Sequence, residues 1–120
     1  MSKIIGIIGS RSRDSGPDMY AVVQAFESVY KDGDWICSGG CPKGGDRFAK
    51  LIHQQGSIPY LEFPADWKQH GRTAGIIRNT QIAKFSDVLI ACVASNRTGG
   101  TEDTIKQFTT MHPDRQILIV

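Results

Sequence analysis

The sequence predicts one α/β domain over residues 1–120, with a five-stranded, mostly parallel sheet in the order 3-2-1-4-5 and helices on both faces. Three observations predict this fold class. Short apolar runs alternate along the chain with amphipathic segments. The runs are almost continuously apolar, as in parallel strands that are covered on both faces. The length of 120 residues suits one domain with its own core.

Five apolar runs are the expected strands, and they lie at residues 3–8, 35–37, 58–63, 88–93 and 116–120. Right-handed crossovers between consecutive parallel strands make the order 3-2-1-4-5 the simplest winding. We expect the last run to be an edge strand. A paired edge at the interface of a homodimer is the alternative.

Four segments between these runs have apolar residues three and four positions apart, as helices do. Their apolar stripes are Met19, Val22, Val23, Phe26, Val29 and Tyr30; Phe48, Leu51 and Ile52; Ile76, Ile77, Thr80 and Ala83; and Ile105, Phe108 and His112. Asp18 is the expected N-cap of the first helix, behind Pro17. Residues 64–73 are the longest expected loop, and a loop of that length is typically functional or mobile.

Composition excludes several classes of partner. The formal net charge is +2, from 14 basic and 12 acidic residues, so we expect no nucleic-acid partner. No apolar run approaches the roughly 20 residues that span a bilayer, so we expect no membrane partner. The first apolar run is too short and too broken for a signal peptide, so we expect a cytoplasmic protein. The three cysteines are expected to be reduced thiols. Cys37 and Cys41 lack a second ligand pair, so no metal site is expected, and none of the functions considered below requires a cofactor.

Glycine-rich or polar loops follow the first four expected strands, at residues 9–13, 38–40, 64–67 and 98–101. Ligands of open α/β sheets bind at this edge, where the strand order reverses. Glycine lets the backbone approach a phosphate closely, and helix N-termini favour anions. The pattern therefore predicts a nucleotide or sugar-phosphate ligand. The P-loop and the usual dinucleotide fingerprint are both absent.

The expected ligand-binding residues are Gly9, Ser10, Arg11, Ser38, Gly39, Gly40, Asp46, Trp67, Asn79, Gly99, Gly100 and Thr101. For Asp46 we favour a structural role, either as a cap of the second helix or as an acceptor that fixes the 38–40 loop. Trp67 either stacks on a base or anchors its own loop. Arg11 either binds a phosphate or belongs to a solvated basic loop. Arg78 either clamps a phosphate or is a surface arginine, and Asn79 either bonds a ribose hydroxyl or caps locally.

Four segments resemble the SLOG superfamily in its YspA-like branch. They are Ser38-Gly39-Gly40-Cys41-Pro42-Lys43-Gly44-Gly45-Asp46-Arg47-Phe48-Ala49, then Phe63-Pro64-Ala65-Asp66-Trp67, then Gly71-x-x-Ala74-Gly75-x-x-Arg78-Asn79, and finally Thr98-Gly99-Gly100-Thr101. The matches occur in family order and span most of the chain.

The resemblance implies a Rossmann-like fold that binds nucleotides or nucleotide-derived ligands. Relatives include the lonely-guy phosphoribohydrolases, sensor domains for ADP-ribose-like signals and a DNA-processing branch. By this resemblance Arg78 matches the catalytic arginine of the hydrolases. Glu102 or Asp103 would supply their carboxylate, although the Gly99-Gly100-Thr101 loop is one residue shorter than theirs. The alternative, which we favour slightly, is that the two carboxylates only stabilise the start of a helix through its dipole.

Three hypotheses follow. The first is a sensor or signalling module that binds a nucleoside monophosphate or an ADP-ribose-like ligand. The second is a phosphoribohydrolase that cleaves the N-glycosidic bond of a nucleoside 5'-monophosphate, with Arg78 on the phosphate and Glu102 or Asp103 supporting an oxocarbenium-like transition state. The third is an interaction protein with a vestigial pocket.

Overall fold

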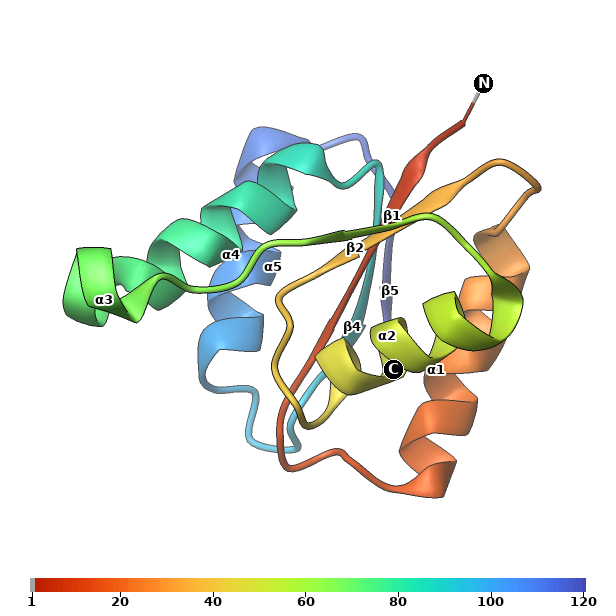
Figure 1. The fold of residues 1–120 in the computed structure, drawn as a ribbon, viewed down its shortest axis with the longest axis horizontal. Coiled ribbons are helices and arrows are strands. Elements are labelled where there is room, and N and C mark those ends of the chain that lie inside the picture. Colours follow the sequence, from red (N-terminus) through yellow and green to blue (C-terminus); the bar gives the residue numbers. More distant parts are fainter. Residues whose placement is uncertain (1) are drawn as a thin grey trace.

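The computed structural model describes residues 2–120, and it confirms the expected fold class (Figure 1). One five-stranded sheet has the order β3-β2-β1-β4-β5. Its strands are β1 (Ile4–Gly9), β2 (Trp35–Ser38), β3 (Tyr60–Glu62), β4 (Val88–Cys92) and β5 (Ile117–Ile119). Every pairing between these strands is parallel, whereas the sequence predicted only a mostly parallel sheet.

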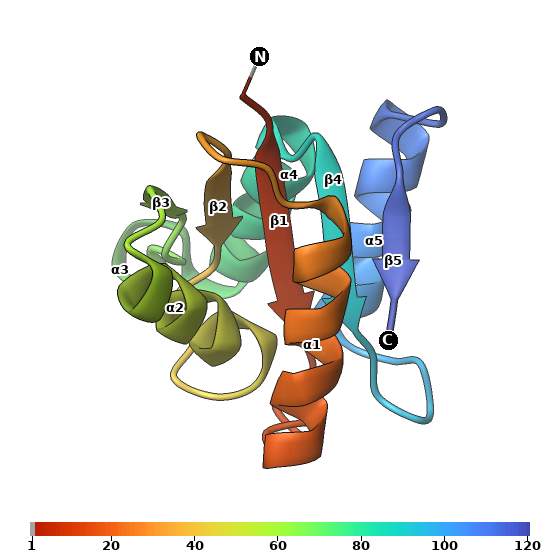
Figure 2. The same cartoon turned by 90° about the vertical axis from the view of Figure 1, so that its right-hand side faces the viewer.

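Helices cover both faces of the sheet (Figure 2). They are α1 (Gly16–Val29), α2 (Gly45–Gly56), α3 (Trp67–His70), α4 (Ala74–Phe85) and α5 (Gly100–Met111), with a short 3₁₀ helix, η1 (Gly71–Thr73), between α3 and α4. Helices α1 and α2 pack on one face, and α4 and α5 on the other. Each face of the sheet has its own cluster of buried apolar side chains. Residues of β1 contribute to both clusters, because successive residues of a strand point to opposite faces. Ile5 and Ile7 lie under α1 and α2, and Ile8 lies under α4 and α5. No helix within residues 2–120 is long and apolar enough to cross a membrane.

The first helix begins earlier than the sequence predicted. Its N-cap is Ser15, so the prediction of Asp18 was wrong by three positions. Ser15 Oγ accepts the backbone N–H of Asp18 at 3.2 Å, and Asp18 Oδ2 accepts the backbone N–H of Ser15 at 3.2 Å. This reciprocal pair is a capping box, in which the acidic residue stands three places after the cap.

The segment 64–73 is not the long loop that the sequence predicted. It contains α3 and η1. Asp66 is the N-cap of α3, and its Oδ1 accepts the backbone N–H of Gln69 at 3.1 Å. This segment leads directly into α4, so its position is set by the helix that follows.

The apolar stripe expected on α4 was partly wrong. Ile76 is 56% exposed and Ile77 is 37% exposed, whereas Ala74, Ile82 and Ala83 are buried. The helix therefore presents small residues and Ile82 to the sheet. Its rotation about its own axis is set by neighbouring elements that periodicity alone does not reveal.

A buried carboxylate fastens the start of β1 to the turn before β2. Asp34 is 2% exposed, and it accepts the backbone N–H groups of Lys3 at 3.0 Å and Lys31 at 2.9 Å, as well as the ammonium of Lys3. Burial alone would raise the pKa of Asp34, but the hydrogen bonds from Lys3 and Lys31, together with the charge of Lys3, lower it below its usual value.

We expect Asp34→Asn to lower the free energy of unfolding by about 2 kcal/mol at neutral pH. A carboxylate with a lowered folded-state pKa stabilises the fold above its unfolded-state pKa, and this contribution is lost as the pH falls through the folded-state value. The difference between wild type and variant should therefore shrink below about pH 4. Urea unfolding at pH 7 and pH 3 checks this, with Asp32→Asn in the exposed part of the same turn as the control. Equal losses in the two variants at pH 7 would contradict the buried role of Asp34.

Candidate functional site

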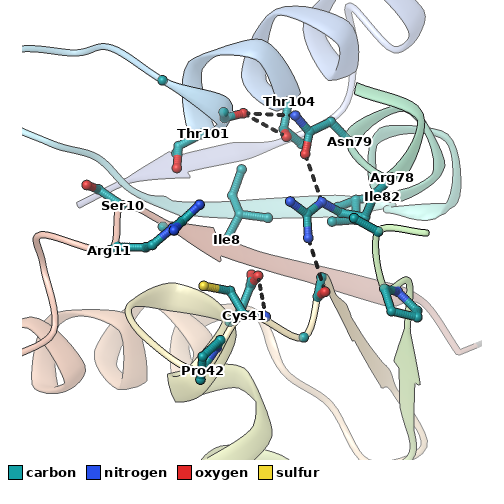
Figure 3. A pocket seen from close by; sticks show the side chains of 18 of the residues that line it. Ile8, Ser10, Arg11, Cys41, Pro42, Arg78, Asn79, Ile82, Thr101 and Thr104 are labelled. Atoms are coloured by element: carbon teal, nitrogen blue, oxygen red, sulfur yellow. Dashed lines mark hydrogen bonds between the residues drawn. The ribbon is translucent and has the colours of Figure 1, made fainter. Parts of the chain in front are cut away.

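A cavity of about 640 Å³ lies at the carboxyl edge of the sheet, where the sequence placed the ligand (Figure 3). The chain winds from β1 to β2 and β3 on one side and then crosses to β4 on the other, so the strand order reverses between β1 and β4. Loops that follow these strands diverge there and leave a crevice. The residues that line the cavity and were expected to bind ligand or act in catalysis are Gly9, Ser10, Arg11, Gly39, Gly40, Asp46, Trp67, Arg78, Asn79, Gly99, Gly100 and Thr101.

The loop after β2 contains two glycines for two different reasons. A Cβ on Gly39 would lie 2.5 Å from Arg78 Nη1 and 2.9 Å from Asp46 Oδ2, so the backbone there is packed against both side chains. Gly40 has φ of +80°, a left-handed conformation that favours glycine. This loop therefore brings its bare backbone to the wall of the cavity.

Asp46 forms hydrogen bonds with both ends of that loop. Its Oδ1 lies 2.7 Å from Ser38 Oγ, and its Oδ2 accepts the backbone N–H of Cys41 at 3.1 Å. We expected Asp46 to accept N–H groups of the 38–40 loop; in the structure its partners there are the Ser38 hydroxyl and the N–H of the next residue, Cys41. Asp46 does not cap α2, because Gly44 is the N-cap and no side chain caps it. Ser38 is fully buried and does not line the cavity.

Asp14 joins the loop after β1 to the segment that opens α2. Its Oδ1 accepts the backbone N–H of Gly44 at 2.7 Å and Arg47 Nε at 2.8 Å. These hydrogen bonds hold the pKa of the Asp14 carboxyl below its usual value. Two walls of the cavity are thereby connected by a group that stays ionised near neutral pH.

Two arginines give the cavity its positive charge. Arg78, on α4, donates from Nη1 to the carbonyl oxygen of Gly39 at 3.1 Å and from Nε to Asn79 Oδ1 at 3.1 Å. Arg11 points its guanidinium toward the middle of the cavity (Figure 3). It forms no ion pair or side-chain hydrogen bond with the residues at positions 2–120. Of the described residues in the lining, Asp46 alone carries a carboxylate, and that carboxylate is already engaged.

The two carboxylates expected to support hydrolysis lie outside the lining. Glu102 forms a two-point pair with Arg97, at 2.8 Å and 3.0 Å. Asp103 Oδ2 accepts Asn79 Nδ2 at 3.0 Å and Gln107 Nε2 at 3.0 Å. Both carboxylates are therefore hydrogen-bonded to side chains of the protein. Arg78 lines the cavity, and neither carboxylate does.

Trp67 lies at the rim of the cavity, on α3. It is 59% exposed, and a Cβ on Gly75 would lie 3.4 Å from its ring, so one part of the indole rests on the start of α4. The remaining surface of the ring is available to a planar group.

Comparison with known proteins finds fold relatives only. No protein-family model matches the chain, and no curated protein sequence does. A solved structure described as the molybdenum cofactor binding protein from the phototrophic bacterium Rippkaea orientalis superposes with a TM-score of 0.74 at 19% identity, over 99% of this chain and 76% of that one. The Moco carrier protein from Chlamydomonas reinhardtii gives a TM-score of 0.53 at 13% identity, over 100% of this chain and 90% of that one. The chain shares their Rossmann-like fold. Its place in the YspA-like branch stays a prediction.

Sequence reasoning missed several residues of the lining, namely Ile8, Cys41, Pro42, Pro64, Ala65, Ile82 and Thr104. Cys41 and Pro42 directly follow the Gly39-Gly40 pair, so their position in the sequence was a usable signal. Ile8 was assigned to a strand core, although it directly precedes the loop at residues 9–13 that the sequence placed at the ligand edge. Thr104 donates to the carbonyl oxygen of Gly100 at 3.1 Å, which follows from helix geometry once α5 is placed.

Proposed function

We propose that this protein binds a small ligand that combines a phosphate with a planar heterocycle, and that it does so without cleaving it. The observation that carries the proposal is the charge of the cavity. Arg11 and Arg78 line it, and its one carboxylate, on Asp46, is tied to the protein. Guanidinium groups bind phosphate through paired hydrogen bonds, and these are stronger than hydrogen bonds between neutral groups.

The start of α5 supplies the second part of the phosphate site. Gly99 is the N-cap of α5, with φ of +95°, and no side chain caps the helix. Backbone N–H groups of the first turn lack intrahelical acceptors, and they carry the positive end of the helix dipole. Because Gly99, Gly100 and Thr101 line the cavity opposite the Gly39 loop, a phosphate between them meets donors from two sides.

The heterocycle belongs at the rim, where Trp67, Pro64 and Ala65 form the less polar wall. Stacking of a base on an aromatic side chain contributes about 1–3 kcal/mol. A cavity of about 640 Å³ also lies within the usual range for small-molecule sites. A nucleoside monophosphate or an ADP-ribose-like compound satisfies these requirements.

The molybdenum cofactor is a second member of the same chemical class, because it joins a fused pterin ring to a terminal phosphate. Both fold relatives are described as proteins of this cofactor. The donors in this cavity suit its phosphate, and Trp67 suits its ring. We therefore include the molybdenum cofactor as a candidate ligand, in addition to the nucleotides.

The phosphoribohydrolase alternative receives less support. It needs a carboxylate beside the anomeric carbon, and Glu102 and Asp103 are held by Arg97 and by Asn79 with Gln107. The interaction-protein alternative predicts that the cavity has no ligand. It receives less support, because two guanidinium groups, of Arg11 and Arg78, line the cavity, and Arg11 forms no ion pair with the residues at positions 2–120.

Proton NMR of the purified protein with AMP, GMP, CMP, ADP-ribose and NAD tests the proposal. We expect line broadening of at least one compound and no signals of free base. Release of base from a monophosphate, lost in Arg78→Ala, would establish the hydrolase instead. In a parallel experiment the protein is mixed with molybdenum cofactor released from a molybdoenzyme, and retained molybdenum is measured after gel filtration. No broadening and no retained molybdenum would favour the interaction protein.

A further inference from the structure

Three side chains from two helices form a continuous chain of hydrogen bonds beneath the cavity. Arg78 Nη1 donates to the carbonyl oxygen of Gly39, and Arg78 Nε donates to Asn79 Oδ1. Asn79 Nδ2 donates to the carbonyl oxygen of Gly100 at 3.3 Å and to Asp103 Oδ2 at 3.0 Å. Figure 3 shows the contact of Arg78 with Asn79. The chain thus joins the loop after β2 to the first turn of α5.

The partners of Asn79 allow one orientation of its amide. Its nitrogen side faces two acceptors, the carbonyl oxygen of Gly100 and the Asp103 carboxylate, and neither can donate a proton when Asp103 is ionised. Its oxygen side faces Arg78 Nε, which can only donate. Reversing the amide would break all three hydrogen bonds, and Asn79 is only 7% exposed, so water would not readily replace them.

We infer that Asp103 is a positioning residue: its carboxylate fixes the amide of Asn79, and through that amide it aims the guanidinium of Arg78 at the ligand. This inference rests on the proposed function only for the last step, the presence of a ligand. It also reassigns Asp103, which the family resemblance offered as a catalytic carboxylate. Gln107 Nε2 also donates to Asp103 Oδ2, so the carboxylate is itself held in place.

A positioning role and simple charge repulsion predict opposite changes in ligand affinity when the Asp103 carboxylate is removed. A carboxylate near a phosphate site repels the ligand, so on charge alone its removal should tighten binding. If Asp103 positions Arg78, removal of its acceptor oxygens should weaken binding instead. Asp103→Asn removes the charge but keeps an acceptor for Asn79 Nδ2, whereas Asp103→Ala removes both.

The first experiment needs no ligand. We record the Arg78 Nε–H signal in ¹H–¹⁵N spectra, assigned through its loss in Arg78→Lys. We expect this signal to shift and broaden in Asp103→Ala and to stay near its wild-type position in Asp103→Asn. The backbone amide signals report whether each variant is folded. An Arg78 signal that is unchanged in Asp103→Ala, or changed alike in both variants, would overturn the inference.

The second experiment measures AMP affinity. We expect binding about 5-fold weaker in Asp103→Ala and rescued in Asp103→Asn. In an Arg78→Ala background, Asp103→Ala should have no further effect, because the positioned group is gone. Glu27→Ala removes an exposed carboxylate on α1, on the other face of the sheet, and serves as the charge control. Tighter binding in Asp103→Ala, or an equal loss in the Arg78→Ala background, would overturn the inference. If AMP does not bind the wild type, the proposed function fails for this nucleotide, and the ligand-free spectra still decide the role of Asp103.

Discussion

Gly45→Ala is expected to lower the free energy of unfolding by about 3 kcal/mol, the upper end of the roughly 1–3 kcal/mol that extra volume in a packed site typically costs. A Cβ on Gly45 would lie 2.2 Å from the carbonyl carbon of Ile8 and 2.4 Å from the backbone nitrogen of Gly9. Both are backbone atoms of β1, which cannot rotate away as a side chain would. Urea unfolding followed by circular dichroism measures the loss.

The matched control is Gly16→Ala. Gly16 is also the first residue of a helix, α1, but a Cβ there meets nothing within 4 Å. We expect its free energy of unfolding to change by about 0.5 kcal/mol or less. A comparable loss in both variants would mean that the effect comes from the helix terminus and not from the contact of α2 with β1.

Arg78→Ala has the largest expected effect on function. It removes a charged donor from the cavity wall and leaves the carbonyl oxygen of Gly39 without its 3.1 Å hydrogen bond. Hydrogen bonds to charged groups contribute about 1.5–3 kcal/mol, so AMP should bind roughly 10- to 100-fold more weakly. Titration calorimetry with wild type and variant measures the change.

Lys106→Ala is the control for net charge, because Lys106 is exposed on α5 and absent from the cavity lining. It should change AMP affinity little at physiological salt, where charges more than about 8 Å apart in solvent are largely screened. If Lys106→Ala weakens binding as much as Arg78→Ala does, the ligand responds to overall charge and not to this site.

The strand order and the location of the site follow from the sequence because both depend on coarse features. Continuous apolar runs indicate strands covered on both faces, and right-handed crossovers then leave few ways to order them. Loops after parallel strands gather at one edge whatever the details of packing. For this reason the sequence could place Gly39 and Gly99 at the edge of the sheet where the cavity lies.

Side-chain directions could not be predicted in the same way. Ile76 and Ile77 have helical spacing with Ala83, yet they are exposed, because the packing of α4 on the sheet and on α5 sets its rotation. One partner of Asp103 is Asn79, 24 positions away in the sequence, and no local pattern joins these two residues. Such pairings arise only when two helices are placed side by side.

The most direct test of the central claim is a ¹H–¹⁵N spectrum of the protein titrated with AMP. We predict that the amide signals of Gly39, Gly40, Gly99, Gly100 and Thr101 move together and saturate, because they line the proposed phosphate site. In the same titration of Arg78→Ala, these amide signals should shift very little at equal AMP concentration. Signals that stay in place in the wild type, or changes confined to the opposite edge of the sheet around Lys3 and Trp35, would contradict the claim that this cavity binds a phosphate-bearing ligand.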